Sequence, residues 1–156
     1  MVYVTRRAHF SAAHRLFNPG FSDERNEEVF DKCNNPHGHG HNYELEVTVR
    51  GLPDPATGYV IDLKRLARLM DEHVVDRVDH KHLNHDVDFL RGVIPTAENI
   101  AVLFWQILEP RIAAAVTNGA ELHSIRLYES ANNFVDYFGA PVEVARYGAA
   151  MQEAEA

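Results

Sequence analysis

The chain contains two stretches in which apolar and polar residues alternate, and both carry histidines at one end. The first covers residues 2–14 and ends at His14, and the second covers residues 39–49 and begins with His39 and His41. Side chains two positions apart lie on the same face of a β-strand. Each histidine therefore extends the apolar stripe of its strand, and the pattern predicts that the three imidazoles lie on the buried side of a sheet.

Histidines grouped in this way are typical of a metal site. Gly40 separates His39 from His41 and leaves the opposite face of the strand empty between them. Three protein ligands with one open position are the usual catalytic zinc arrangement, whereas structural zinc is usually closed by four ligands. Each histidine alone is better explained as a polar residue at a strand end, because histidine is intermediate in burial. The three together favour a zinc site.

Length and composition limit what the rest of the chain can be. A chain of 156 residues is most simply one domain, and it is long enough to bury about two thirds of its unfolded surface. We expect the working domain to cover residues 1–148, followed by an alanine-rich tail, residues 149–156, that is frayed.

Charge and cysteine content restrict partners and location. The net charge of −8 disfavours broad contact with the nucleic-acid backbone. The single cysteine excludes an intramolecular disulfide and fits a reducing compartment. Neither a signal peptide nor a membrane-spanning apolar run is evident, so we expect a cytoplasmic protein with no membrane partner.

The order of predicted elements indicates the fold class. Residues 16–36 are polar and predict a long loop between the two strands. Asp62 and Thr96 are good N-caps for two helices, with Gly119 expected to close the second. Residues 122–130 and 134–138 then alternate again and predict a hairpin. The sequence thus predicts an α+β fold, β-β-α-α-β-β, with a four-stranded antiparallel sheet and two helices on one face. The edge strands of such a sheet have unpaired backbone groups that must be covered, and association of subunits is one way to cover them.

Other polar residues are candidates for chemistry. Glu129 continues an apolar stripe and offers two acceptor oxygens, which suit a ligand with adjacent N–H donors unless the strand end is simply solvated. Cys33 could be a fourth zinc ligand, or a base whose pKa a nearby cation and histidine would lower. Asp79 and His80 could relay protons to a thiol. His37 lies on the histidine side if the second strand extends back that far.

Six short motifs follow one another along the chain: residues 10–16 (FSAAHRL), 33–43 (CNNPHGHGHNY), 54–58 (DPATG), 78–81 (VDHK), 95–99 (PTAEN) and 128–130 (YES). In these motifs, over about residues 3–139, the chain resembles the 6-pyruvoyl tetrahydropterin synthase and 6-carboxytetrahydropterin synthase family. The resemblance implies a tunnelling fold, in which trimers close their sheets into a barrel and two trimers form a homohexamer with active sites at subunit interfaces.

The resemblance also implies roles for residues that match the family motifs. His14, His39 and His41 match the Zn²⁺ ligands, and Cys33 matches the catalytic base. Asp79 and His80 match the pair that relays protons to this base. Glu129 matches the anchor of the pterin ring, and Thr96 and Glu98 match a segment that lines the pterin pocket.

The implied substrate is 7,8-dihydroneopterin triphosphate. Zinc would act as a Lewis acid on the side-chain hydroxyls, and triphosphate would leave by elimination. Internal redox rearrangement would give 6-pyruvoyl tetrahydropterin, whereas carbon–carbon cleavage would give 6-carboxytetrahydropterin and acetaldehyde, which feeds queuosine synthesis. Five residues separate Cys33 from His39, a spacing similar to that of pyruvoyl-forming members, but spacing does not settle the product. The alternatives are a non-catalytic Cys-His₃ structural zinc module and an aldolase-like cleavage of dihydroneopterin.

Overall fold

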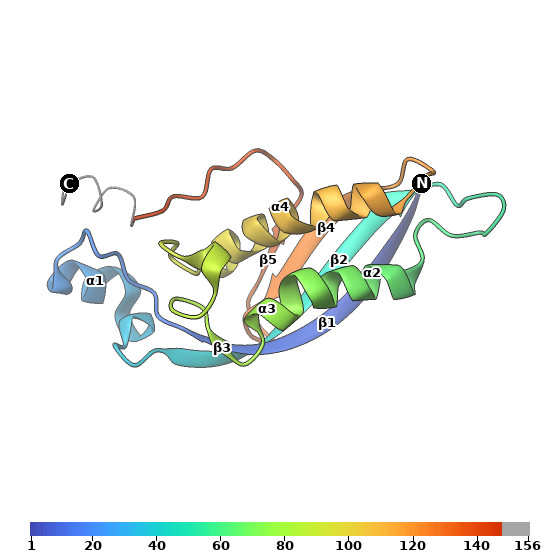
Figure 1. The fold of residues 1–156 in the computed structure, drawn as a ribbon. Helices are drawn as coiled ribbons and strands as arrows, with labels where there is room; N and C mark the ends of the chain where they lie inside the picture. The colour runs from blue at the N-terminus through green and yellow to red at the C-terminus, as the bar shows by residue number, and fades with distance from the viewer. Residues whose placement is uncertain (148–156) are drawn as a thin grey trace.

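The computed structural model describes residues 1–147 and contains one sheet with helices on one of its faces (Figure 1). The sheet order is β3-β1-β2-β4-β5. Its strands are, in chain order, β1 Val2–His14, β2 His39–Gly51, β3 Lys81–His82, β4 Glu121–Tyr128 and β5 Phe134–Tyr137. The α+β fold with antiparallel β1, β2, β4 and β5 is as predicted. The predicted strand count of four is too low, because the short β3 adds to the edge, parallel to β1.

The pairing of β1 with β2 fixes the histidines in space. The two strands pair antiparallel from Val2 opposite Gly51 to His14 opposite His39. Burial alternates along most of β2, as the sequence pattern predicts for a strand with one buried face. This register places His14 directly beside His39 at the end of both strands.

The connection between β1 and β2 is not the plain loop that the sequence predicts. It contains helix α1, Asp23–Phe30, and a 3₁₀ turn, Asp31–Asn34. Ser22 caps α1, since its side chain accepts a hydrogen bond from the backbone N–H of Arg25. Only Asn26 of α1 is buried. A helix without an apolar stripe leaves no periodic signal in the sequence, which explains why the prediction missed it.

The two predicted helices begin at their expected caps. Asp62 caps α2, Leu63–Met70, which continues through a π-helical turn, Asp71–Val75, into α3, Asp76–Val78. Thr96 caps α4, Ala97–Ala115. Figure 1 shows α2 and α4 lying across the same face of the sheet. α4 ends before Gly119, and that glycine has a positive φ of 75° in the turn toward β4.

The core lies between this sheet face and the helices. Tyr43 and Leu45 of β2 and Leu127 of β4 are almost fully buried, as are Ile100 and Phe104 of α4. A bulge in β4 shifts the register, so that Leu122 pairs with Val49 and Ser124 pairs with Thr48. The alternation along residues 122–130 is therefore interrupted at His123, which does not lie on the buried face with Ile125. His123 instead makes edge contacts with the rings of Tyr3 and Phe138.

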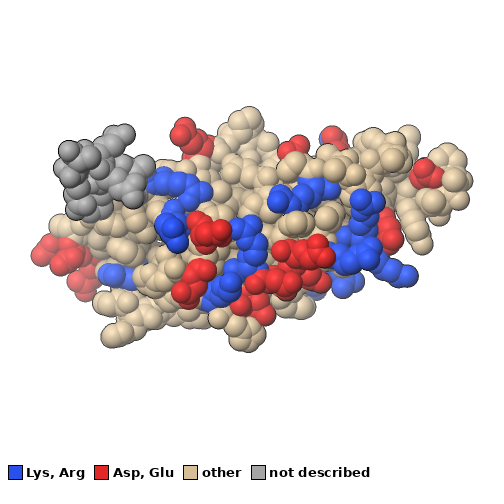
Figure 2. All heavy atoms as spheres, in the orientation of Figure 1, with Lys and Arg blue, Asp and Glu red and all other residues tan. Residues whose placement is uncertain are grey.

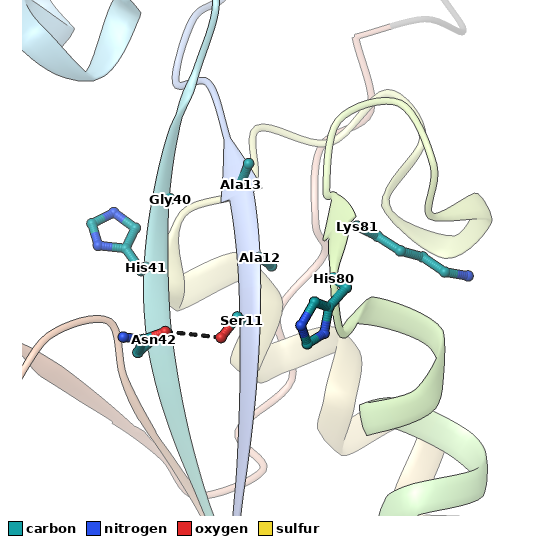
Figure 3. Close-up of a pocket in the computed structure, with 8 residues that line it drawn as sticks. All are labelled: Ser11, Ala12, Ala13, Gly40, His41, Asn42, His80 and Lys81. Atoms are coloured by element: carbon teal, nitrogen blue, oxygen red, sulfur yellow. Dashed lines mark hydrogen bonds between the residues drawn. The ribbon is translucent and has the colours of Figure 1, made fainter.

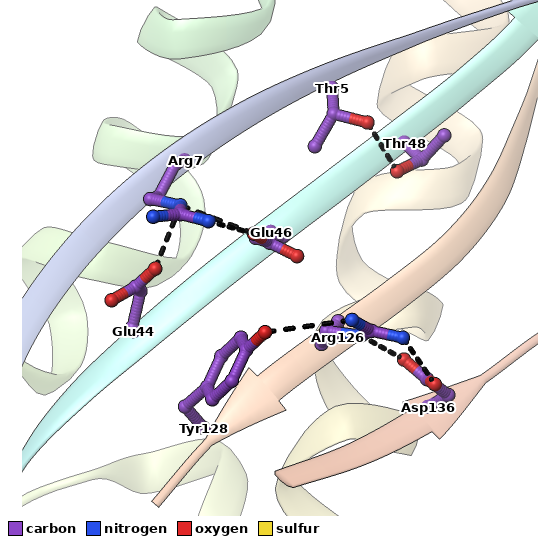
Figure 4. A network of polar contacts seen from close by, with 8 residues as sticks. All are labelled: Thr5, Arg7, Glu44, Glu46, Thr48, Arg126, Tyr128 and Asp136. Carbon is purple, nitrogen blue, oxygen red and sulfur yellow. Dashed lines mark hydrogen bonds and ion pairs between the residues drawn. The ribbon is translucent and has the colours of Figure 1, made fainter. Parts of the chain in front are cut away.

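The other face of the sheet is polar. Figure 4 shows Arg7 between two glutamates of β2, and Arg126 of β4 bound to Asp136 of β5. Nε of Arg7 lies 2.7 Å from a carboxylate oxygen of Glu44. Acidic and basic side chains are interspersed over the surface in Figure 2. Exposed ion pairs of this kind contribute little to stability, because water and salt screen them. The sheet therefore has one dry face and one face suited to water.

Both edges of the sheet are largely open within residues 1–147. β3 pairs with β1 only at Ala12 and Ala13, so the outer edge of β1 before these residues has no neighbouring strand in the described chain. At the other edge, β5 pairs only with β4. Open edges present unpaired backbone donors and acceptors and favour strand addition. None of the described helices is long and apolar enough to cross a membrane.

Candidate functional site

The structure brings His14, His39 and His41 together at the end of the β1–β2 ladder. One ring nitrogen from each lies within 4.8 Å of the others. The Nε2 atoms of His14 and His39 are 2.9 Å apart. His14 is fully buried, whereas the other two are half-buried and open the cluster toward solvent on one side.

His14 is held in one tautomer. Its Nδ1 lies 2.9 Å from the carbonyl oxygen of Pro95, and because a carbonyl can only accept, Nδ1 must carry the proton. The lone pair of the neutral ring is then on Nε2, which faces the other histidines. The pKa of His14 is lowered to about 4, chiefly by burial and also by the neighbouring histidines, against the opposing effect of the Pro95 bond. His14 is therefore neutral at physiological pH.

The donor set fits a divalent metal ion such as zinc. Buried Nδ1 of His39 and buried Nε2 of His41 have no hydrogen-bond partner in the described chain. Leaving buried polar atoms unpaired is costly unless a ligand satisfies them. Burial also lowers the pKa of His39, which keeps that ring neutral and ready to donate a lone pair. A histidine that ligates a metal commonly donates its other N–H to a carbonyl, as His14 does to Pro95.

Glu129 joins the histidine cluster to a cavity. Its carboxylate oxygens lie 3.7 Å from Nε2 of His41 and 4.0 Å from Nε2 of His14. The same residue lines a cavity of about 310 Å³ together with Glu98 at the start of α4 and Phe134 of β5. A carboxylate therefore stands between the histidine cluster and a pocket of ligand size. Thr96 caps α4 beside this cavity, because its side-chain hydroxyl oxygen accepts a hydrogen bond from the backbone N–H of Asn99.

Cys33 lies in the 3₁₀ turn that precedes β2 and is half-buried. Its carbonyl accepts a hydrogen bond of 2.8 Å from the N–H of Leu16, which follows the end of β1. Burial raises the pKa of the Cys33 thiol, and the charges of Glu129 and Asp31 raise it further. The direction is opposite to the lowered pKa expected beside a cation, since the chain alone surrounds the thiol with negative charge.

Asp79 and His80 lie on the other side of β1 from His41. The carboxylate of Asp79 accepts the Ser11 N–H and lies 3.0 Å from Nδ1 of His80. His80 has a positive φ of 59° and is largely exposed. Figure 3 shows the His80 ring on the side of β1 away from His41. Both residues line a cavity of about 360 Å³. Within residues 1–147, no hydrogen bond or ion pair joins this pair to Cys33.

Two contributors to the site were missed by sequence reasoning, and one candidate is not part of it. The Tyr43 hydroxyl lies 3.3 Å from Nδ1 of His14, and burial raises the pKa of this phenol. Tyr43 follows His41 on the same strand face, so its spacing could have identified it. The Pro95 carbonyl gave no sequence signal, because any residue carries one. His37 is exposed and lies outside the three-histidine cluster.

Comparison with known proteins gives consistent matches over most of the chain. The family model described as 6-pyruvoyl tetrahydropterin synthase matches residues 3–140. The chain is 46% identical to human 6-pyruvoyl tetrahydrobiopterin synthase over 87% of this chain and 90% of that protein. It is 28% identical to 6-carboxy-5,6,7,8-tetrahydropterin synthase of Rickettsia typhi over 87% of this chain and 99% of that protein. The solved 6-pyruvoyl tetrahydropterin synthase of Caenorhabditis elegans superimposes with a TM-score of 0.79 at 38% identity, covering 89% of this chain and 96% of that chain.

Proposed function

The chain belongs to the 6-pyruvoyl tetrahydropterin synthase family, and we propose that it converts 7,8-dihydroneopterin triphosphate to 6-pyruvoyl tetrahydropterin and triphosphate with bound zinc. Membership of the family makes it a metal-dependent lyase of tetrahydropterin biosynthesis. The observation that carries the finer proposal is the cluster of three histidines beside Glu129, whose carboxylate lines the cavity. The pyruvoyl product is supported by the higher identity to the human relative than to the carboxy-forming one.

Each residue of the site has a role that its position supports. His14, His39 and His41 would hold Zn²⁺, which supplies Lewis-acid activation of the substrate hydroxyls. Glu129 would bind adjacent N–H donors of the pterin ring through its two oxygens, because a carboxylate is a strong bidentate acceptor. Glu98 lines the same cavity, and Thr96 fixes the start of α4 that carries it.

Cys33 would serve as the base that removes a proton from the substrate side chain. The chain by itself disfavours its thiolate, since burial and the charge of Glu129 raise the pKa of the thiol. A bound divalent cation would reverse this balance by favouring the anionic form. Proton removal at Cys33 is thus coupled to occupancy of the histidine cluster.

Asp79 and His80 would meet Cys33 across a subunit interface. In one chain, within the described residues, no hydrogen bond or ion pair joins them to the thiol, and the exposed His80 ring lies on the side of β1 away from His41. The open edges of β1 and β5 favour sheet extension between copies, which supports a homohexamer built from two trimers. We place the catalytic domain at residues 1–148 and the enzyme in the cytoplasm, whose reducing conditions suit an active thiol. The predicted tail, residues 149–156, lies outside the described residues.

The proposal is tested by incubating zinc-loaded protein with 7,8-dihydroneopterin triphosphate, measuring triphosphate release and identifying the pterin by mass. A pyruvoyl product supports the proposal, a carboxy product with acetaldehyde moves the protein to the queuosine branch, and no release refutes the lyase assignment. Cys33→Ala should abolish turnover while zinc stays bound. Loss of zinc in that variant would instead favour a structural Cys-His₃ module. Turnover of unphosphorylated dihydroneopterin would favour aldolase-like cleavage, since that substrate has no triphosphate to eliminate.

A further inference from the structure

The last described segment, residues 139–147, forms a strap that runs beside α4 toward the end of the molecule that carries α1 (Figure 1). Almost all of it lies beyond residue 140, where the family match ends. The family match therefore covers only its first two residues. Its contacts, however, reach two segments that hold residues of the site.

The strap is fixed where it leaves β5. Gly139 has a positive φ of 87°, and a Cβ at this position would overlap the ring of Trp105 on α4. The Tyr137 hydroxyl donates a hydrogen bond to the carbonyl of Ala140. Farther along, Val144 packs against the hydrophobic core. The strap thus has a defined course over α4.

The far end of the strap binds the loop that follows β3. Arg146 donates to the carbonyl oxygens of Phe89 and Arg91, at 2.9 Å and 2.7 Å. The backbone N–H of Tyr147 donates to the carbonyl of Gly92 at 2.7 Å. Three backbone carbonyls of this loop therefore accept hydrogen bonds from the strap, two of them from a charged donor.

This loop leads directly to the acceptor of His14. Pro95 lies three residues after Gly92, and its carbonyl oxygen takes the Nδ1 proton of His14 at 2.9 Å. Asn99 holds the same stretch, because its side-chain amide donates to the carbonyl of Ile94. Movement of the loop would turn the His14 ring and displace the lone pair that faces the metal site.

The strap also contacts the segment that holds Cys33. The ring of Tyr147 lies 6.3 Å from that of Phe17, and the Arg15 guanidinium stacks over Phe17 at 4.2 Å. Arg15 in turn donates to the backbone carbonyl and the side-chain oxygen of Asn34, the residue after Cys33, at 2.9 Å and 3.0 Å. A tilted pair of aromatic rings and a cation–π contact therefore connect the strap to the turn that carries the thiol.

We propose that the strap is a positioning element that clamps the Phe89–Gly92 loop and the Arg15–Phe17 segment, and thereby sets both the His14 ring and the Cys33 thiol. Arg146 and Tyr147 are its positioning residues, and neither touches the metal ligands directly. The proposal rests on the proposed function for its catalytic consequence. Its effects on metal affinity and thiol reactivity do not depend on any substrate.

The test compares Arg146→Ala and the double variant Arg146→Ala/Tyr147→Ala with the full-length protein. Glu143→Ala is the matched control, since Glu143 is an exposed charged residue of the same strap. Zinc affinity is measured by competition with a chromophoric chelator. Thiol exposure is measured in metal-free protein from the rate of iodoacetamide alkylation, which reports on Cys33 alone because it is the single cysteine.

In both Arg146 variants we expect zinc affinity to fall about tenfold, which is the low end of the range for loss of a residue that supports a metal ligand. We also expect the alkylation of Cys33 to be about tenfold faster. kcat should fall with little change in KM, and Glu143→Ala should behave as the unmodified protein. A lower Tm with unchanged zinc affinity and alkylation rate would overturn the proposal, because it would make the strap merely stabilising. Absence of turnover in the unmodified protein would refute the proposed function, while the zinc and alkylation measurements would still decide the role of the strap.

Discussion

Protonation of His14 should destabilise the metal-free protein in acid. The pKa of this buried ring is about 4 in the folded chain, against an ordinary value of 6.5. The unfolded chain therefore binds a proton before the folded chain does, so the stabilisation is complete above pH 6.5 and is lost as the pH falls toward 4. Linkage gives a loss of about 1 kcal/mol at pH 5.5 and about 3 kcal/mol at pH 4, relative to pH 8.

The assay is urea unfolding followed by circular dichroism, with a chelator present, at several pH values between 8 and 4. His14→Gln removes the titrating ring and serves as the reference, so the difference between the two proteins isolates His14 from the other groups that titrate in this range. We expect this difference to shrink by about 3 kcal/mol between pH 8 and pH 4. Parallel stability curves for the two proteins would refute the reasoning, because they would mean that burial does not hold His14 neutral.

Three further changes probe the packing and the metal site. Gly51→Ala should lower the free energy of unfolding by about 1–3 kcal/mol in urea melts, because the added Cβ would lie 2.8 Å from the Cβ of Ala120; an unchanged melt would contradict this. Thr96→Ala should cost about 1 kcal/mol through loss of the α4 cap, whereas Thr96→Ser should cost little. Gly38→Ala should weaken zinc binding in a chelator competition, since its φ is 74° and its Cβ would lie 2.9 Å from Nε2 of His82. Equal affinity would show that this turn does not support the site.

Local patterns in the sequence were enough to place the elements around the core and the histidines. The alternation in residues 2–14 and 39–49 predicts two strands, and the structure contains both. The caps Asp62 and Thr96 begin helices as expected. These features depend on periodicity and on single capping side chains. Both act within a few residues, so they can be predicted from one sequence.

Other features depended on contacts between residues far apart in the chain. The short strand β3, the bulge that turns His123 away from the core, and the polar helix α1 leave no periodic signal. The environment of Cys33 was also decided in three dimensions, since burial and the distant Glu129 raise the pKa of its thiol. The carbonyl of Pro95 selects the tautomer of His14 from across the fold. The sequence alone predicts which side chains could carry the chemistry. The tertiary structure determined their orientation and charge, because both follow from packing and from the local dielectric.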